Sequence, residues 1–430
     1  MPKSKHLFIS VKTSVTCLIL LLLSLQISFA FDLVPDRRSE IADGKFGWLV
    51  ATTPISIQGI GTTVPITGIF SNVYKSTDLM AVKSVFGEEL DITAATFMEL
   101  PAFTENVLLY GGYFESQMPI KRYQRSIDSD PEEFILPYQR TKGIFSQIKL
   151  NFYERRLEAY LQYNQGGSRP IKVFDADGNE FSNIDTSEST FETVSVGTMI
   201  DLTDSRHDPR QGIRFGIERK FPRNKNQDNS DYFVTDMDLA LYIPFFQKDT
   251  LVFNIYRSMA TVTREGLVDE AQLRAEKGLG CVLGMPLYEQ CYAAETKQIL
   301  EIQSANKYGS AASIGGSNRL RAYNAGRFRA GNSAFYGMEY RYNFSSEEKE
   351  VNLFFLGGIK TLFQLAAFAE AGTVNDDASQ LTENLKPSYG IGFRAIISSL
   401  VYRFDIATGD EGVGFTVFID YPFELNPITG

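Results

Sequence analysis

The clearest pattern in this chain is an alternation of apolar and polar residues with a period of two, strongest in the C-terminal third. From Tyr336 to Phe344 every second residue is apolar, whereas Glu339 and Arg341 belong to the opposite set. Every odd position from Val413 to Phe423 is also apolar. Alternation of this kind predicts β-strands that present one apolar and one polar face.

Sixteen segments either show this pattern or have a length that suits such a strand. The length of most of them is near the roughly 9–11 residues that a tilted membrane strand requires. They are 47–58, 62–74, 77–85, 90–98, 105–117, 142–152, 154–165, 190–203, 212–221, 231–245, 250–263, 334–344, 361–373, 387–397, 399–408 and 413–423. A soluble β-sandwich alternates in the same way, strand by strand. The number and length of the segments favour an all-β, 16-stranded antiparallel transmembrane β-barrel, because closed barrels and helices are the structures that satisfy backbone groups in lipid.

The connections between these segments differ in length in a regular way. Outer-membrane barrels have short periplasmic turns and longer external loops. With both termini in the periplasm, the expected short connections are Tyr153, 246–249 and Ser398, and the expected long ones are 118–141, 166–189 and 264–333. The segment 345–360 is an exception, since it is too long for a periplasmic turn.

Residues 1–30 have the three parts of a secretory signal peptide. Lys3, Lys5 and Lys12 form a basic head, an apolar run extends from Val15 to Leu25, and 28–30 supplies a small-residue cleavage site. An uncleaved membrane anchor is the alternative. Export combined with a closed sheet predicts the outer membrane of a Gram-negative bacterium, with outer-membrane lipid and lipopolysaccharide around the barrel.

Composition and charge disfavour some classes of function. The chain has 33 Phe and 21 Tyr, which suits a barrel with an apolar outer wall. Without the signal peptide it has 39 basic and 52 acidic residues, a net charge of −13, which disfavours nucleic acid as a partner. Cys281 and Cys291 are expected to form a disulfide in an oxidising compartment, with two free thiols as the alternative.

No catalytic constellation is recognisable. His207 is the one histidine after the signal peptide, and it lies in an expected periplasmic turn. No nucleophile-elbow serine, phosphate-binding loop or zinc spacing is present. The sequence therefore predicts no catalytic residues, no metal site and no cofactor, and a protein that is not an enzyme.

Three motifs, in this order along the chain, resemble the bacterial surface antigen family, whose barrel is shared by BamA- and TamA-like assembly proteins. Residues 201–212 resemble the family's turn and contain Asp201, Asp204, Arg206, Pro209 and Gly212. Residues 315–323 resemble its lid-loop signature, with Gly315, Gly316, Leu320, Arg321 and Tyr323, although Ala322 stands where the family usually has Gly. Residues 368–374 resemble an aromatic-x-acid-x-Gly strand that has Glu370 in place of the usual Asp.

The resemblance implies that the long loop 264–333 folds into the lumen as a lid. An Arg fork that meets carboxylates in a partly desolvated space is a directional anchor. Alternation directs Glu339 inward, whereas the inward direction of Glu370 rests on the motif. We therefore expect Arg321 to pair with Glu339 and Glu370, with a solvated loop arginine as the alternative.

The expected organisation is a signal peptide (1–30), a short periplasmic segment (31–46), the barrel (47–423) and a C-terminal extension (424–430). Family members carry periplasmic POTRA domains, and residues 31–46 are too few for one. The resemblance implies a role in inserting or translocating proteins, or lipids, at the outer membrane, with a periplasmic partner subunit or unfolded outer-membrane proteins as partners. A passive or gated pore and a surface structural or adhesion protein are the alternatives.

Overall fold

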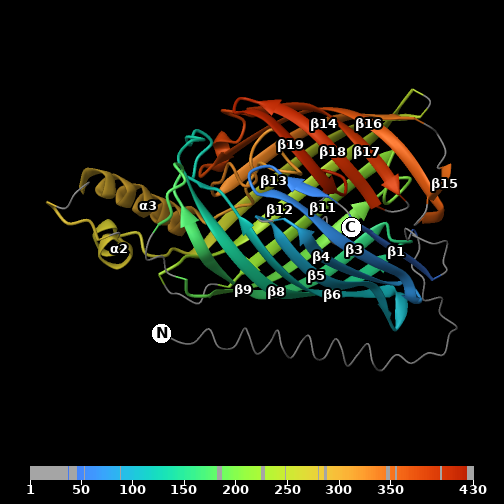
Figure 1. Ribbon diagram of the computed structural model, residues 1–430, viewed down its shortest axis with the longest axis horizontal. Coiled ribbons are helices and arrows are strands. Elements are labelled where there is room, and N and C mark those ends of the chain that lie inside the picture. Colours follow the sequence, from blue (N-terminus) through green and yellow to red (C-terminus); the bar gives the residue numbers. More distant parts are fainter. Residues whose placement is uncertain are drawn as a thin grey trace.

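A computed structural model of the 430-residue chain describes residues 37, 46–52, 54–87, 89–181, 186–223, 228–246, 248–278, 280–284, 288–344, 349–353, 356–397 and 400–423. The expected signal peptide, nearly all of the segment 31–46 and the C-terminal extension lie outside these residues. The described chain forms one antiparallel sheet that closes on itself as a barrel (Figure 1).

The strands follow one another around the wall in chain order. They are β1 (Gly47–Thr52), β2 (Ile55–Ile57), β3 (Gly61–Tyr74), β4 (Thr77–Phe86), β5 (Asp91–Ala102), β6 (Thr104–Pro119), β7 (Arg122–Tyr123), β8 (Phe134–Phe152), β9 (Leu157–Phe174), β10 (Ser189–Asp201), β11 (Gly212–Pro222), β12 (Asp231–Phe245), β13 (Asp249–Arg264), β14 (Asn332–Asn343), β15 (Lys349–Leu353), β16 (Leu356–Asn375), β17 (Lys386–Ile397), β18 (Leu400–Gly409) and β19 (Gly412–Ile419).

These labels correspond to 16 strands of the wall, so the predicted fold is confirmed. β1 and β2 lie one after the other along the same edge of β3, β14 and β15 do so along β16, and β7 is a short addition to β8. β15 also explains the connection 345–360, which is too long for a periplasmic turn. The expected long connection 345–360 is wrong, because most of it continues the strand pairing as β15 and the start of β16.

The alternation in the sequence separates the lipid-facing wall from the lumen. On β14, Met338 is 43% exposed while the neighbouring Glu339 is fully buried, and on β18 Phe404 and Asp405 differ in the same way. Apolar residues therefore face outward, where lipid surrounds them, and polar and charged residues face inward. The lumen is filled by side chains of the wall and of the loop that follows β13, and it contains a packed apolar core as well as charges.

The last strand is shorter than expected. β19 ends at Ile419, and Asp420 adopts a positive φ of 92°, which turns the chain out of the wall. Tyr421 and Phe423 are 3% and 2% exposed inside the barrel, although the sequence pattern assigned them to the same face as Phe415. The expected strand 413–423 is therefore wrong in its last four residues.

The connection between β13 and β14 has an outer and an inner part. Its outer part forms α2 (Glu270–Lys277) and α3 (Tyr288–Tyr308), which project beyond one end of the barrel (Figure 1). By the general rule for outer-membrane barrels, this end with the longest loop is extracellular. Residues 309–331 return into the lumen and form its inner part. Among the described residues, no helix is both long and apolar enough to cross a membrane.

Candidate functional site: two charged clusters in the lumen

The inner part of the lid loop is held by Arg321, whose side chain is fully buried. Its Nε donates to Glu370 Oε1 at 2.8 Å and its backbone N–H donates to Glu370 Oε2 at 2.9 Å. Its Nη2 donates to Glu339 Oε2 at 3.1 Å. The structure therefore brings together the three residues that the sequence linked, with Glu370 facing inward.

The cluster around Arg321 is larger than the sequence suggested. Arg321 Nη1 also donates to Asp405 Oδ2 at 2.9 Å. Arg394 bridges Asp405 and Glu339, while Arg341 bonds to Glu339 and Arg403 to Asp405. Four arginines thus share three carboxylates in a space closed to solvent, where such pairs are strongly directional.

Several of these residues are predictable from alternation alone. Arg341, Arg394, Arg403 and Asp405 each lie between apolar residues that alternate along their strands, which places them on the polar face. The sequence does not say which inward residues meet. That depends on barrel closure and on where the lid enters, neither of which is a local property. We call the seven residues the lid cluster; its members are Arg321, Glu339, Arg341, Glu370, Arg394, Arg403 and Asp405.

Apolar contacts surround the lid cluster. The Arg321 guanidinium lies 3.4 Å from the centroid of the Phe368 ring, a cation–π geometry that is favourable when the cation is desolvated. Ile314 and Leu320 of the lid pack against β16, where a Cβ added to Gly372 would lie 2.8 Å from Ile314 Cδ1. The glycine of the 368–374 motif therefore leaves room for the lid.

The lid motif residues form the turn that presents Arg321. Gly315 and Gly316 have φ values of 112° and 115°, which glycine adopts without strain, and Leu320 has a φ of 53°. Tyr323 donates from its hydroxyl to the Pro387 carbonyl at 3.0 Å. Ala322, where the family usually has Gly, is absent from the positive-φ positions and fits because it faces Gly409.

Other arginines of the lid reach the wall independently of Arg321. Arg319 Nη2 donates to Asp238 Oδ2 at 2.9 Å and its guanidinium lies 3.7 Å from the Tyr256 ring centroid. Arg327 Nε donates to Glu411 at 2.9 Å. Nothing in the sequence pointed to Arg327 or Glu411, because both lie in connections with no alternation.

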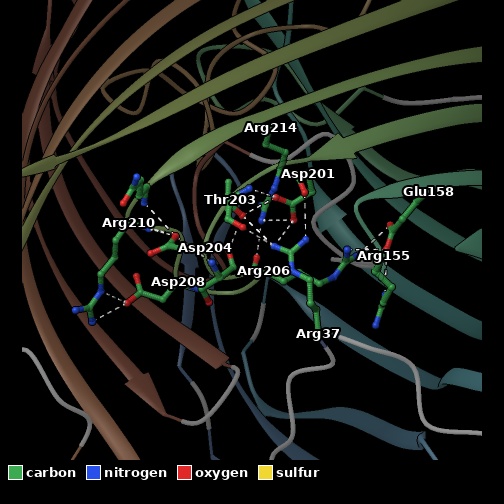
Figure 2. A network of polar contacts seen from close by, with 12 residues as sticks. Arg37, Arg155, Glu158, Asp201, Thr203, Asp204, Arg206, Asp208, Arg210 and Arg214 are labelled. Carbon is green, nitrogen blue, oxygen red and sulfur yellow. Dashed lines mark hydrogen bonds and ion pairs between the residues drawn. The ribbon is translucent and has the colours of Figure 1, made fainter. Parts of the chain in front are cut away.

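A second charged cluster surrounds the connection between β10 and β11 (Figure 2). Asp201 is fully buried and accepts hydrogen bonds from Thr203 and, at 3.2 Å, from Arg214 Nη2. Arg37, which precedes the first strand, donates to the Asp201 and Thr203 carbonyls at 3.1 and 2.9 Å. This connection is therefore packed into the barrel instead of being an exposed turn.

The motif residues of this connection have separable roles. Asp204 Oδ1 accepts the backbone N–H groups of Arg210 and Gln211 at 2.9 and 3.0 Å, which closes the turn. Pro209 is buried. Gly212 starts β11 with a φ of 114°, and an added Cβ there would lie 2.3 Å from the Leu202 carbonyl oxygen.

Arg206 fixes the connection to the wall. Its Nη1 and Nη2 donate to the two carboxylate oxygens of Glu158 at 2.6 and 3.2 Å, a bidentate pair. Arg155 Nε donates to the same Glu158 Oε1 at 3.1 Å. His207 is half-buried beside Arg206, and desolvation together with the Arg206 charge lowers the pKa of its imidazole to about 3. His207 is therefore neutral at ordinary pH.

The residues that follow β19 touch both clusters. Tyr421 places its hydroxyl 2.7 Å from Asp208 Oδ1, in the β10–β11 connection, and the Arg341 guanidinium lies 3.9 Å from the Tyr421 ring centroid. Phe423 packs against Phe335 with ring centroids 6.0 Å apart. The chain after the last strand therefore links the β10–β11 connection to the lid cluster.

The two cysteines lie in the outer part of the lid loop. Cys281 and Cys291 form a disulfide with their Cα atoms 5.8 Å apart, between α2 and the start of α3. Among the described residues, no group of three or more His, Cys, Asp or Glu side chains is arranged to hold a metal ion.

Among the described residues, the junction between the first and last strands has the fewest paired positions in the wall. β19 and β2 pair at one position, Val417 with Ser56, whereas β18 and β19 pair at eight. β1 pairs with β3 on one side, and no described residue pairs with its other edge. Turning the chain inward at Asp420 removes the residues that would have extended this seam.

A closed barrel with an apolar outer wall and a filled, charged lumen defines the class: this is an outer-membrane β-barrel of a Gram-negative bacterium. The Omp85 superfamily domain matches residues 140–421, well over half of the chain. The chain therefore belongs to the Omp85 superfamily, and the resemblance to the BamA-like barrel is confirmed.

Solved structures with a similar fold have little sequence identity to this chain. CdiB from Escherichia coli is 11% identical with a TM-score of 0.50, over 87% of this chain and 62% of that one. BamA from Haemophilus ducreyi lacking POTRA domains 1–3 is 12% identical with a TM-score of 0.48, over 87% of this chain and 69% of that one. The chain thus spans less than two thirds of that CdiB chain. No curated protein matches the sequence.

Proposed function

We propose that this barrel assists the insertion or translocation of proteins at the outer membrane through the seam between its first and last strands. The observation that carries this proposal is the short pairing between β2 and β19. Unfolded outer-membrane proteins are the substrates that suit such a seam, because an extended chain adds to an unpaired strand edge through main-chain hydrogen bonds. The proposal includes a separate periplasmic subunit that delivers such chains.

Energetics support the seam as the place where the wall opens. An unsatisfied backbone group costs several kcal/mol in lipid, so each fully paired junction of the wall strongly resists separation. The β2–β19 junction has one described residue pair to break, and the outer edge of β1 is unpaired by any described residue. Phe46 and Trp48 beside that edge are each 62% exposed on the lipid side.

The filled lumen argues against a permanently open pore. Lid residues Ile314, Leu320, Tyr323 and Phe328 share one apolar core with wall residues such as Phe335. The lid cluster adds charge-assisted hydrogen bonds to this packing. A passive route through the lumen would require this core to be displaced, whereas opening at the seam would not.

The test is a disulfide that locks the seam. Val417 and Ser56 are directly opposite each other, and cross-strand Cα distances of about 4.5–5.5 Å suit a disulfide. We would make Ser56→Cys/Val417→Cys, and Ala81→Cys/Ala95→Cys across the fully paired β4–β5 junction as the control. Both are compared in cells depleted of the native protein, by the amount of other barrels that assemble.

We expect the seam-locked variant to fail under oxidising conditions and to recover with reductant, while the β4–β5 control works under both. The control also accounts for any effect of reducing the native Cys281–Cys291 bond. Normal assembly by a fully oxidised seam-locked variant would refute the seam as the route. Normal assembly in depleted cells that express no variant would refute the assembly role itself.

A further inference from the structure

A group of basic side chains lies on the outer wall, near the extracellular ends of β8 and β9. Arg140 and Lys142 are two residues apart on β8 and so project from the same face, with side chains 47% and 55% exposed. Arg169 on β9 is directly opposite Arg140 in the strand register and is also exposed. This face is the lipid side, because Ile144 and Phe152 further along it are exposed apolar residues.

The pairing of Arg140 with Arg169 is electrostatically unfavourable by itself. Side chains that face each other across two strands lie about 5 Å apart at Cβ, and like charges in that arrangement destabilise a sheet. The charge of Arg140 is partly compensated, because its Nε donates to Glu115 Oε1 at 2.6 Å. In the described part of the chain no acidic residue forms an ion pair with Arg169.

These side chains line a hollow in the wall of about 340 Å³, which we call the wall hollow. Its lining residues are Glu115, Arg140, Lys142, Gly167, Arg169 and Glu188. Lys142 Nζ lies 3.4 Å from Glu188 Oε2. Gly167 lies directly beneath the Glu188 side chain, because a Cβ added to Gly167 would lie 2.0 Å from Glu188 Oε1. Three cations against two carboxylates leave the wall hollow with one excess positive charge.

The wall hollow sits at the height of the outer lipid headgroups. Tyr113 and Tyr163 lie opposite Ile144 and Ser146 of β8 and donate from their hydroxyls to Glu115 and Gln165. Aromatic residues of this kind form girdles at the membrane–water boundary of outer-membrane barrels. Ten residues separate Lys142 from Phe152, which is about 26 Å along the axis for a strand tilted by about 40°. That length matches the roughly 25 Å apolar band of such barrels.

We propose that the wall hollow binds the phosphate groups of the phosphorylated glycolipid that forms the outer leaflet. Phosphate oxygens would accept hydrogen bonds from the paired guanidinium groups and remove the repulsion between Arg140 and Arg169. The acyl chains would then lie along the apolar residues below, starting at Ile144. A soluble acidic protein fits less well, because the cations are level with the headgroups and project into them.

The test measures binding of diphosphoryl lipid A to the purified full-length protein in detergent, without divalent cations, by native mass spectrometry and by competition with a fluorescent lipid A. Dephosphorylated lipid A and inorganic phosphate are the comparison probes. The variants are Arg140→Gln/Lys142→Gln/Arg169→Gln and Glu115→Gln/Glu188→Gln. Arg264→Gln is the matched control, since this exposed arginine at the end of β13 pairs with Asp231 outside the wall hollow.

We expect the triple variant to bind diphosphoryl lipid A on the order of 100-fold more weakly, about fivefold for each cation near a charged surface. The Glu115→Gln/Glu188→Gln variant should bind diphosphoryl lipid A more tightly than the native protein. If the triple variant does not fold, this comparison alone tests the proposal. Arg264→Gln should not change binding. Equal binding of the two lipid A forms, wild-type affinity in the triple variant, or displacement by inorganic phosphate at matching concentration would each overturn the proposal.

Discussion

Replacing Arg321 with alanine tests whether the lid cluster anchors the lid. Within the described residues, Arg321 is the one cation paired with Glu370, to which its Nε donates at 2.8 Å. The backbone N–H of Arg321, which alanine keeps, donates to the same carboxylate at 2.9 Å. Glu339 and Asp405 keep other arginines when Arg321 is removed. The main consequence of the substitution is therefore one buried carboxylate, Glu370, that has lost its cationic partner and keeps a backbone hydrogen bond.

The size of the effect follows from two opposing contributions. Three charge-assisted hydrogen bonds of the Arg321 side chain are lost, each with a net value of about 1.5–3 kcal/mol, but such values do not add within one network. The substitution also lowers the excess of arginines over carboxylates in the cluster. Loss of one partner from a buried ion pair typically costs about 3–5 kcal/mol, and we expect Arg321→Ala to lower the free energy of unfolding by that amount.

The measurement is guanidinium unfolding of the barrel in detergent micelles, followed by the fluorescence of Trp48, the single tryptophan of the chain. The matched control is Arg321→Ala/Glu370→Gln, which keeps the shape of the Glu370 side chain and removes its charge. We expect this double variant to recover at least half of the loss. If it is no more stable than Arg321→Ala, an unpaired carboxylate is not the cause and the reasoning is wrong.

Three further predictions follow from the two clusters. Arg321→Ala should raise the conductance of the purified protein in planar bilayers, because the lid loses its main anchor; an unchanged conductance would mean that packing alone holds the lid. Burial lowers the pKa of His207 from its ordinary 6.5 to about 3, so the unfolded state takes up a proton below pH 6.5 that the folded state does not. His207 should therefore lower the free energy of unfolding by about 2 kcal/mol between pH 7 and pH 5, measured by denaturant titration as the difference between the native protein and His207→Gln. Tyr421→Phe should cost about 1–3 kcal/mol in the same unfolding measurement, since Asp208 loses a buried hydroxyl partner, whereas Tyr402→Phe in the wall should cost less.

The strands of the wall could be predicted because alternation is a local property. A residue such as Met338 or Glu339 has a defined side once its strand is recognised, whichever strands lie next to it. The end of β19 could not be predicted in this way. Tyr421 and Phe423 continue the alternation, and only their burial against Phe335 and Arg341 draws them into the lumen.

The segments that form the helices of the lid loop contain local helix signals, which an analysis of alternation does not detect. Asp269 caps the N-terminus of α2 by accepting from the Gln272 backbone N–H, and Glu270 follows in the first turn. The segment of α3 contains no Gly or Pro over 21 residues. The lid anchor was predictable only in part. Arg321, Glu339 and Glu370 belong to recognisable motifs, but the contact with Asp405 requires β18 to be brought beside the lid by closure of the barrel.

The short seam and the burial of Tyr421 and Phe423 in the lumen are consequences of one feature, the departure of the chain from the wall at Asp420. Had residues 420–423 continued β19, they would have paired along the free edge of β1 and left a gap beside Arg341 and Phe335. Inside the barrel, Tyr421 and Phe423 instead bury aromatic surface, which is favourable by several kcal/mol for two such rings. This gain offsets the backbone pairing that the seam lacks. The residues that pack in the lumen, Tyr421 and Phe423, are therefore the same residues whose absence from the wall leaves the first and last strands with the fewest pairs among the described residues.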